Sequence, residues 1–446
     1  MNFMANKNYY SIAKNTIKEL NKFSIPLIIN SFFNIGISSI LSAIIGRISM
    51  VALASTEVVD SFLYAFVGIL GVGTLAFNIS ASKIKSNKSE FFDWFKSIFE
   101  LNFIIGSSGV VFIIFSSKKI LSFLYNFNGI ELSIGSFYAN IQSLLILFNM
   151  MIFSMGNLLK VNKKTKEILY IGIISSILQL VLSYYFVYFI FEAEYRIIGI
   201  SLASVISLGF EVASYIFILR KDFFYIIKIK STKKIKILKN SILLVFQELL
   251  EGSVFQILIV SMISQLGLLT ISSYSVAMKI FGISVLPMYI YCNALTVFIG
   301  ESIEKTDIYK LKILPILTTS ITTLFFLIVF FVMILNKSIF IKFYTNIDNV
   351  ILDTEKILIF TLLFSWTQVL FENTKYSLQA LEKANIVLKI TGIVNTFTII
   401  ILITIRYFYT ISLFIILLVL SLNYILLSIL FYYNYYIEIN YIQEKL

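Results

Sequence analysis

The sequence predicts an all-α polytopic membrane protein with about 12 transmembrane helices in two pseudo-symmetric six-helix lobes. Of its 446 residues, 59% are hydrophobic and 13% are charged, whereas about 25% of the residues of a soluble domain are charged. The mean hydropathy is +0.91. Apolar runs long enough to cross a bilayer recur along the whole chain. These observations exclude a soluble fold.

The residue types that are scarce also exclude several kinds of site. The chain has one cysteine, Cys292, and no histidine, so it predicts no internal disulfide, no Cys metal site and no His-based proton shuttle. The net charge of +12 is attributed to Lys-rich cytoplasmic loops and not to a nucleic-acid partner. We therefore expect no cofactor and no bound metal, and a lipid bilayer and a small-molecule substrate as the partners.

The N-terminal segment is expected to be a short amphipathic helix on the cytoplasmic surface. Met1 to Lys22 holds four lysines and alternates polar with apolar residues, which is unlike a signal peptide. Ser24-Ile25-Pro26 then marks the start of a helix, because proline fits the first turn. Run length predicts spans near 24–45, 57–80, 97–115, 135–157, 168–191, 197–219, 240–264, 270–299, 312–335, 356–380, 387–405 and 409–435.

The charges of the connecting loops set the orientation. Basic loops follow spans 2, 4 and 6, and the loop 220–239 holds eight Lys or Arg residues against one acidic residue, Asp222. The loop after span 5 instead carries Glu192 and Glu194. The alternation predicts that both termini are cytoplasmic. Loop 220–239 is the natural linker between an N-terminal lobe, 1–225 (spans 1–6), and a C-terminal lobe, 226–446 (spans 7–12).

The two halves resemble each other. A shift of about 221 residues places Pro26 to Ser55 on Gln247 to Val276 without a gap, with Asn30 on Glu251. Because each half has an even number of spans, the halves share one orientation in the membrane. Parallel repeats of this kind are common in transporters, whose site lies between the halves.

Glu251 is the leading candidate for the functional site. It falls near the middle of the apolar run 240–264, where a carboxylate costs about 2.5–3.5 kcal/mol and needs a partner, a proton or a water-filled cavity. Gln247, Glu251 and Phe255 recur every four residues and share one helix face. The alternative is a buried, hydrogen-bonded structural group.

These features resemble the multidrug and toxic-compound extrusion (MATE) family over nearly the whole chain. Pro26 and Gly46-Arg47 look like the first helix of that family and its Gly-Arg turn, and Glu251 with Phe255 looks like its seventh helix; Ala52-Leu53-Ala54, Ile198 to Ser204 and Leu266-Gly267 fit as well. The resemblance implies a two-lobed, twelve-helix antiporter in the plasma membrane, most simply bacterial, that exports amphipathic or cationic organic compounds in exchange for Na⁺ or H⁺.

The chain also departs from the family pattern. Leu41 stands where many members carry an Asp in the first helix, and Gln179 and Ser183 stand for an Asn and an Asp in the fifth. The resemblance therefore implies that the N-terminal lobe lacks its usual carboxylates. Its remaining polar candidates for the substrate cavity are Asn30, Asn149 and Gln179, for which the alternative role is a hydrogen bond between helices.

The expected cation-coupling residues are Glu251, Glu248 and Glu372. Two carboxylates in a low-dielectric cavity can share a proton, and the same oxygens suit Na⁺, so both ions stay open. Glu372 and Lys375 lie three apart on one helix face, so a plain ion pair is the alternative. Gln247, Asp60, Tyr289 and Asn293 are further cavity candidates. Asp60 attracts a cationic substrate or pairs with Lys279 in span 8, the helix that Pro287 kinks.

Other functions fit the sequence less well. A flippase for a lipid-linked or polysaccharide precursor needs a basic cavity, and few Lys or Arg residues lie at mid-span. An intramembrane enzyme lacks His and a large catalytic loop, and a nucleotide-driven pump lacks a phosphate-binding Gly-x-x-x-x-Gly-Lys motif. A member that has lost transport stays open because the N-terminal carboxylates are missing. The sequence thus predicts a monomeric, cation-coupled exporter that is not an enzyme.

Overall fold

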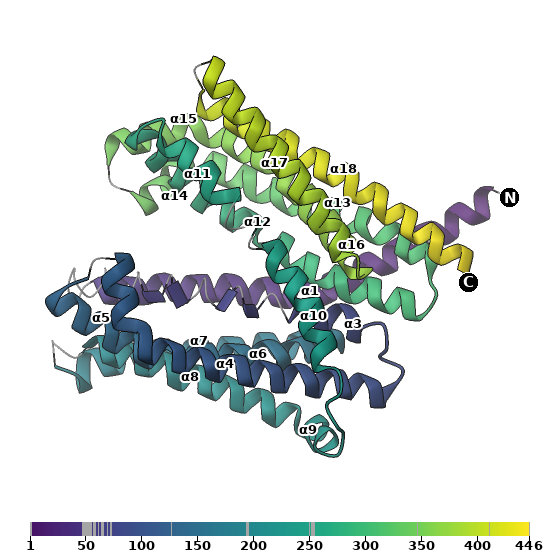
Figure 1. The fold of residues 1–446 in the computed structure, drawn as a ribbon, viewed down its shortest axis with the longest axis horizontal. Coiled ribbons are helices and arrows are strands. Elements are labelled where there is room, and N and C mark those ends of the chain that lie inside the picture. The colour runs from purple at the N-terminus through teal and green to yellow at the C-terminus, as the bar shows by residue number, and fades with distance from the viewer. Residues whose placement is uncertain are drawn as a thin grey trace. The chain divides into compact units, whose positions relative to one another are not determined.

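The structure is a computed structural model (Figure 1). It describes residues 2–46, 74–125, 127–192, 196–248, 255–345, 347–409 and 411–445, together with residues 56, 59, 60, 62, 63, 67, 68, 70, 71 and 250. The described residues are almost entirely helical. The chain forms two units, an N-terminal unit of Ile25–Val245 and a C-terminal unit of Met1–Ser24 with Phe246–Leu446.

The helix α1 (Asn2–Gly46) runs through both units. The N-terminal unit continues with α3 (Leu75–Ala81), α4 (Lys88–Tyr125), α5 (Gly129–Gln142), α6 (Leu144–Val161), α7 (Thr165–Tyr185), the π-helical turn η1 (Phe186–Ile190), α8 (Arg196–Ile218), α9 (Arg220–Ile227) and most of α10 (Lys234–Glu248). The C-terminal unit contains α11 (Gln256–Ser264), α12 (Leu268–Glu304), α13 (Ile308–Leu335), α14 (Lys337–Tyr344), α15 (Asp348–Ser365), α16 (Thr367–Ala380), α17 (Ala384–Phe408) and α18 (Leu413–Lys445).

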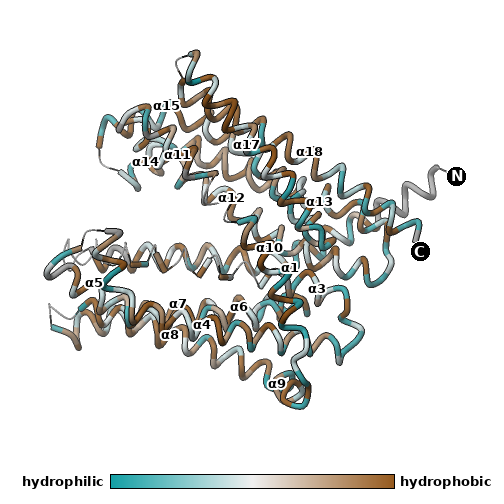
Figure 2. The backbone as a smooth tube through the Cα atoms, in the orientation of Figure 1, coloured by the Kyte–Doolittle hydropathy of each residue, from teal (hydrophilic) through white to brown (hydrophobic). Residues whose placement is uncertain are grey.

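The helices are apolar enough to cross a membrane along most of the chain. Within the described residues, nine helical stretches meet the length and composition of a span, and hydrophobic residues cover most of α4, α8 and α18 (Figure 2). The expected spans near 57–80 and 240–264 include residues outside the described part of the chain. The span expected near 356–380 consists of the end of α15 and all of α16, which meet at Trp366.

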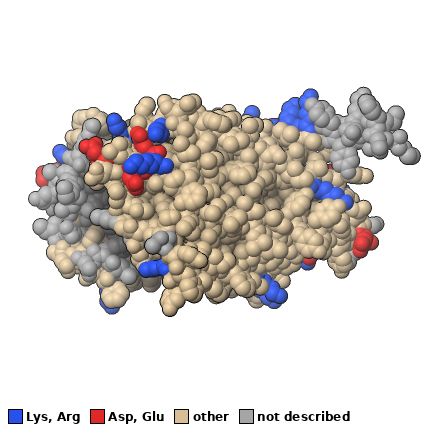
Figure 3. Space-filling model, turned by 90° about the horizontal axis from the view of Figure 1, so that it is seen from above, with Lys and Arg blue, Asp and Glu red and all other residues tan. Residues whose placement is uncertain are grey.

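Figure 3 shows one face of the molecule, which is largely uncharged. Its Lys, Arg, Asp and Glu side chains gather toward the two ends of the face and leave a broad uncharged area between them. Large hydrophobic side chains on the outer faces of the helices are exposed, including Phe115, Phe189 and Leu335. Such a surface is expected where lipid replaces water around a helical bundle. The protein is therefore a multi-pass membrane protein.

The two halves repeat the same kinds of interhelical hydrogen bond and helix break. Their spacing is close to the repeat of about 221 residues that the sequence predicts. In the N-terminal unit, Asn102 of α4 donates a hydrogen bond to Ser154 of α6 at 2.6 Å. In the C-terminal unit, Asn373 of α16 donates to Thr322 of α13 at 3.0 Å, at the corresponding positions. Breaks between consecutive helices also correspond, at Ser143 and at Trp366. The internal repeat is thus visible in the packing of the helices as well as in the sequence.

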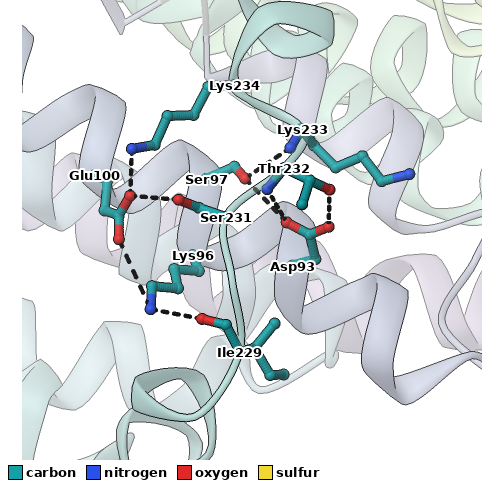
Figure 4. Close-up of polar contacts among 9 residues, drawn as sticks. All are labelled: Asp93, Lys96, Ser97, Glu100, Ile229, Ser231, Thr232, Lys233 and Lys234. Carbon is teal, nitrogen blue, oxygen red and sulfur yellow. Dashed lines mark hydrogen bonds and ion pairs between the residues drawn. The ribbon is translucent and has the colours of Figure 1, made fainter.

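The basic connection between the halves is fixed to α4 (Figure 4). Asp93, 9% exposed, accepts hydrogen bonds from the backbone N–H of Thr232 at 2.7 Å, from the Thr232 hydroxyl, and from Ser97 at 3.2 Å. Glu100 accepts from Ser231 at 2.7 Å and pairs with Lys234. The loop therefore packs with the N-terminal unit, and the two units divide after Val245, whereas the sequence placed the division after residue 225.

The first half of α1 packs against the C-terminal unit. Asn21 accepts a hydrogen bond from the Tyr291 hydroxyl at 2.6 Å, and Glu19 pairs with Lys310 at 2.8 Å. Phe23 meets Phe298 edge to face, with ring centroids 5.9 Å apart. The described part of the N-terminal segment, expected to lie on the membrane surface, is thus continuous with the first membrane helix and is docked by its side chains.

Candidate functional site

The helix α16 is the most polar helix in the interior of the C-terminal unit. Eleven of its side chains are buried, and they include Glu372, Asn373, Lys375 and Gln379. The helix packs against α12, α13 and α18, which shield it from the lipid. A helix that buries polar groups in this way must satisfy them with partners inside the protein, because hydrocarbon offers none.

Glu372 and Lys375 form an ion pair at the centre of α16. The Lys375 Nζ lies 2.8 Å from the Glu372 Oε2, and each side chain is only 5% exposed. The same Nζ lies 4.9 Å from the centroid of the Phe371 ring and 5.6 Å from that of Tyr376, so two aromatic faces add to the stabilisation of the cation. The alternative that the sequence left open for this pair, a direct ion pair, is what the structure shows.

The energetics of this pair make it a candidate site as well as a structural feature. Removal of two charges from water costs several kcal/mol per ion, and their attraction offsets this cost only with good geometry. Loss of one partner of a buried pair typically costs about 3–5 kcal/mol, because the other charge stays buried and unpaired.

Amide and hydroxyl contacts surround the ion pair. Gln379 donates to the side-chain oxygen of Gln247 at 2.8 Å, which brings the end of α10 against α16. Gln368 lies 3.3 Å from the Tyr289 hydroxyl and is oriented to donate to it. Asn293 donates to the backbone carbonyl of Tyr289, at 2.9 Å. Three predicted cavity residues, Gln247, Tyr289 and Asn293, thus make polar contacts on α16 or on α12, which packs against it.

Of the predicted carboxylates Glu248 and Glu251, the structure describes the first. Glu248, the last residue of α10, is exposed, and its charge acts on Tyr376. Glu251 lies outside the described residues. Among the predicted coupling residues that the structure describes, Glu372 is therefore the one that is buried in the C-terminal unit.

The predicted residues of the N-terminal unit form separate polar contacts. Asp60 accepts hydrogen bonds from the Tyr138 hydroxyl at 3.0 and 3.1 Å, and Gln142 donates to that hydroxyl at 2.7 Å. Lys279, which the sequence offered as a partner for Asp60, lies in the C-terminal unit with its Nζ 5.7 Å from the centroid of the Tyr344 ring. Asn149 donates to the carbonyl oxygen of Leu145 on its own helix at 2.8 Å.

Polar side chains line the contact between α7 and α8. Gln179 of α7 donates to Ser204 of α8 at 2.9 Å, and Ser175 donates to the carbonyl of Ser207 at 2.9 Å. On the other side of α7, the Asn30 side chain of α1 fits against Gly172, where an added Cβ would lie 2.2 Å from the Asn30 Oδ1. Gln179 thus makes a hydrogen bond between helices, which is its alternative role. Asn30 lies at a contact between helices, where its Oδ1 has no hydrogen-bond partner within the described residues.

The sequence reading passed over one membrane-embedded carboxylate, Glu211 of α8. It lies on the same helix face as Ser204, Ser207 and Tyr215, all of which are buried, and its own side chain is partly buried. The signal was present, because Glu211 is the one acidic residue in the apolar run of span 6 and acidic residues at membrane depth are functional candidates.

The described residues offer no dedicated metal centre. Within them, no three Asp, Glu, His or Cys side chains gather to hold a metal ion. An alkali cation or a proton needs fewer ligands, and a single carboxylate with hydroxyl or carbonyl oxygens is enough to bind either.

Residues 244–405 match the model of the MatE family. Solved structures extend the likeness to nearly the whole chain. An outward-facing multidrug resistance MATE transporter of the MOP superfamily is 14% identical, with a TM-score of 0.82 and 96% of each chain covered. The bent form of a Vibrio cholerae MATE transporter is 15% identical, with a TM-score of 0.82, covering 97% of this chain and 99% of that one. The chain therefore has the fold of the MATE transporters.

Two further comparisons define how far this assignment reaches. A MOP superfamily transporter from Pyrococcus furiosus is 15% identical, with a TM-score of 0.80 and 96% of each chain covered, and the reverse polarity of its binding pocket suggests a different function for that protein. No curated protein matches the sequence. The fold predicted from the sequence is confirmed, and the predicted family resemblance is matched over residues 244–405.

Proposed function

We propose that this protein is a cation-coupled antiporter that exports organic, amphipathic or cationic compounds by alternating access. The observation that carries the proposal is the buried pair of Glu372 and Lys375 on α16. A carboxylate at membrane depth marks an ion pathway by default, and here its present counter-ion is a lysine that Na⁺ or H⁺ can replace. Glu251, by its place in the sequence, is the second expected coupling carboxylate.

The proposed coupling is a competition for the Glu372 carboxylate. When a proton or Na⁺ occupies it, Lys375 loses its partner and its charge becomes free to move. The free energy of ion binding can then favour one orientation of the transporter over the other, to the extent that the ion binds the two orientations with different affinity. The substrate is expected to leave when the ion enters.

Dye efflux from proteoliposomes under an imposed H⁺ or Na⁺ gradient tests this proposal. Glu372→Gln and Glu251→Gln are compared with wild type, and Glu355→Gln is the matched control, because Glu355 also pairs with a lysine, at 3.4 Å, but at the surface. Gradient-driven efflux that survives in both test variants contradicts the proposal. The double variant Glu372→Gln/Lys375→Met removes both charges and shows whether loss of transport reflects an unpaired lysine alone.

A flippase is the second candidate, and Lys375 favours it. A buried cation in a membrane-embedded helix could pair with a lipid-linked phosphate. Lys375→Met should then abolish movement of an anionic lipid precursor, whereas the antiporter keeps part of its cationic dye efflux in that variant. We further propose that the protein works as a monomer in a bacterial plasma membrane with both termini in the cytoplasm, as the Lys-rich loops suggest.

A further inference from the structure

Glu211 lies on the buried face of α8, within a helix that is otherwise uncharged from Ile197 to Ile218. Ile200, Ser204, Ser207 and Tyr215 are buried on the same face. This spacing places the Glu211 side chain toward the packed helices of the N-terminal unit. The carboxyl group is therefore partly buried within a membrane-spanning helix.

A row of polar groups leads away from Glu211 along the contact between α7 and α8. On α7, Ser175, Gln179 and Ser183 recur every four residues and share one face. On α8, Ser204 and Ser207 face them, with the hydrogen bonds from Gln179 and Ser175 already described. Ser183 is fully buried, and its hydroxyl oxygen has no hydrogen-bond partner within the described part of the chain. The row thus has an unused polar group at its other end.

The hydroxyl of Ser175 lies at the contact between α7 and α8, one turn of α8 before Glu211. A serine hydroxyl has one proton to donate and two lone pairs to accept with. Ser175 donates its proton to the carbonyl oxygen of Ser207 at 2.9 Å. Its lone pairs are thus the kind of acceptor that a protonated carboxyl group uses and an ionised carboxylate does not.

Among the described residues, no Lys or Arg forms an ion pair with Glu211. On α8 itself, the titratable group on the same face is Tyr215, one turn further along the helix. The charged residues of the elements packed against α8 lie near their ends, and they are Glu131 of α5, Lys160 of α6, Lys166 and Glu167 of α7, and Arg220, Lys221 and Asp222 of α9.

We propose that Glu211 is a proton-binding site of the N-terminal unit, with the polar row of α7 and α8 as its path for hydrogen bonds and water. The inference rests on the proposed antiport and names a second carrier of its coupling ion. It also supplies the carboxylate that the N-terminal unit lacks in its first helix, where Leu41 stands. Glu211 releases its proton to water when the row opens and regains one when the row closes.

Infrared difference spectroscopy of the protein in lipid, recorded while pH is stepped, tests the proton site without a transport measurement. A protonated carboxyl group has a carbonyl stretch that disappears on ionisation. Wild type should show such a band titrating, and Glu211→Gln should lose it, while Glu372→Gln, the matched control, keeps it. In Ser175→Ala, the midpoint of the band should shift. Unchanged bands in Glu211→Gln overturn the proposal.

Further variants distinguish loss of the proton site from a folding defect and from a defect in transport. Glu211→Asp keeps an acid at the position, so a titrating band with a shifted midpoint supports the site even if the Gln variant folds poorly. Proton-driven dye efflux should be lost in Glu211→Gln, and efflux that is unchanged there, or that follows Na⁺ alone in wild type, counts against the proton site. Absence of any dye efflux in wild type, with the band present, counts against the antiporter proposal alone.

Discussion

Substitution of Asp93 by Ala should release Thr232, at the centre of the loop 229–234, from α4. Asp93 accepts hydrogen bonds from the backbone N–H of Thr232 at 2.7 Å, from the Thr232 hydroxyl and from Ser97 at 3.2 Å. Hydrogen bonds to a charged acceptor contribute about 1.5–3 kcal/mol each. Because the loop can hydrate once it is free, we expect a local loss of about 2–4 kcal/mol, less than the sum of the bonds.

Hydrogen exchange of the protein in lipid nanodiscs measures this loss directly. A loss of about 2–4 kcal/mol should speed exchange of the Thr232 amide by about 30- to 700-fold, because every 1.4 kcal/mol is a factor of ten. Amides of the core of α4 should keep their protection. The expected change is therefore confined to peptides that cover 229–237.

Glu90→Ala is the matched control for Asp93→Ala. Glu90 pairs with Lys233 of the same loop at 3.1 Å, but the two side chains are 36% and 28% exposed. Partly exposed pairs contribute about 0–1 kcal/mol, so exchange should change by about fivefold at most. Equal effects of the two substitutions, or no effect of Asp93→Ala, would refute the assignment of Asp93 as the residue that holds the loop.

Two further predictions concern packing and pH. Gly172→Ala should lower the free energy of unfolding by about 1–3 kcal/mol, because the new Cβ would lie 2.2 Å from the Asn30 Oδ1. Asn30→Ala in the same chain should restore most of the thermal stability. A double variant that stays as unstable as Gly172→Ala would count against the contact. The Ser338 hydroxyl, 2.6 Å from the Glu355 carboxylate, lowers the pKa of that carboxyl, with Lys337 adding to the effect. The ionised carboxyl group therefore stabilises the fold at pH values above its unfolded pKa, and this stabilisation is lost as pH falls through its folded pKa. In Glu355→Gln, the decrease of Tm at acid pH should be smaller than in wild type. An unchanged decrease would contradict this.

The sequence predicted the membrane helices well because the signal is local. A run of apolar residues must become a helix in lipid wherever it occurs, and the nine spans found among the described residues all coincide with expected ones. The repeat was also readable, because equivalent positions such as Asn102 and Thr322 serve equivalent hydrogen bonds. The pairing of Glu372 with Lys375 followed from their spacing on one helix.

What the sequence did not predict depends on contacts between distant residues. The attachment of the loop 229–234 to the N-terminal unit involves Asp93 of α4, which binds Thr232, far along the chain. The depth of Glu372 required knowledge of which helices surround α16. Glu211 was visible as an acid in an apolar run, but its burial beside Ser175 depends on how α7 meets α8. The sequence of a membrane protein predicts which residues enter the lipid, but it predicts much less well which helix faces pack against one another.

The docking of α1 on the C-terminal unit has a consequence for how the protein is made. A ribosome completes residues 25–245 before it reaches Tyr291, Phe298 and Lys310, the partners of residues 19–24. The N-terminal unit can therefore assemble first, while the first turns of the chain wait without their partners. Their docking is among the last steps of assembly and depends on synthesis of the second half. A truncated product would leave Phe23 unburied, a feature that membrane quality-control proteases could recognise.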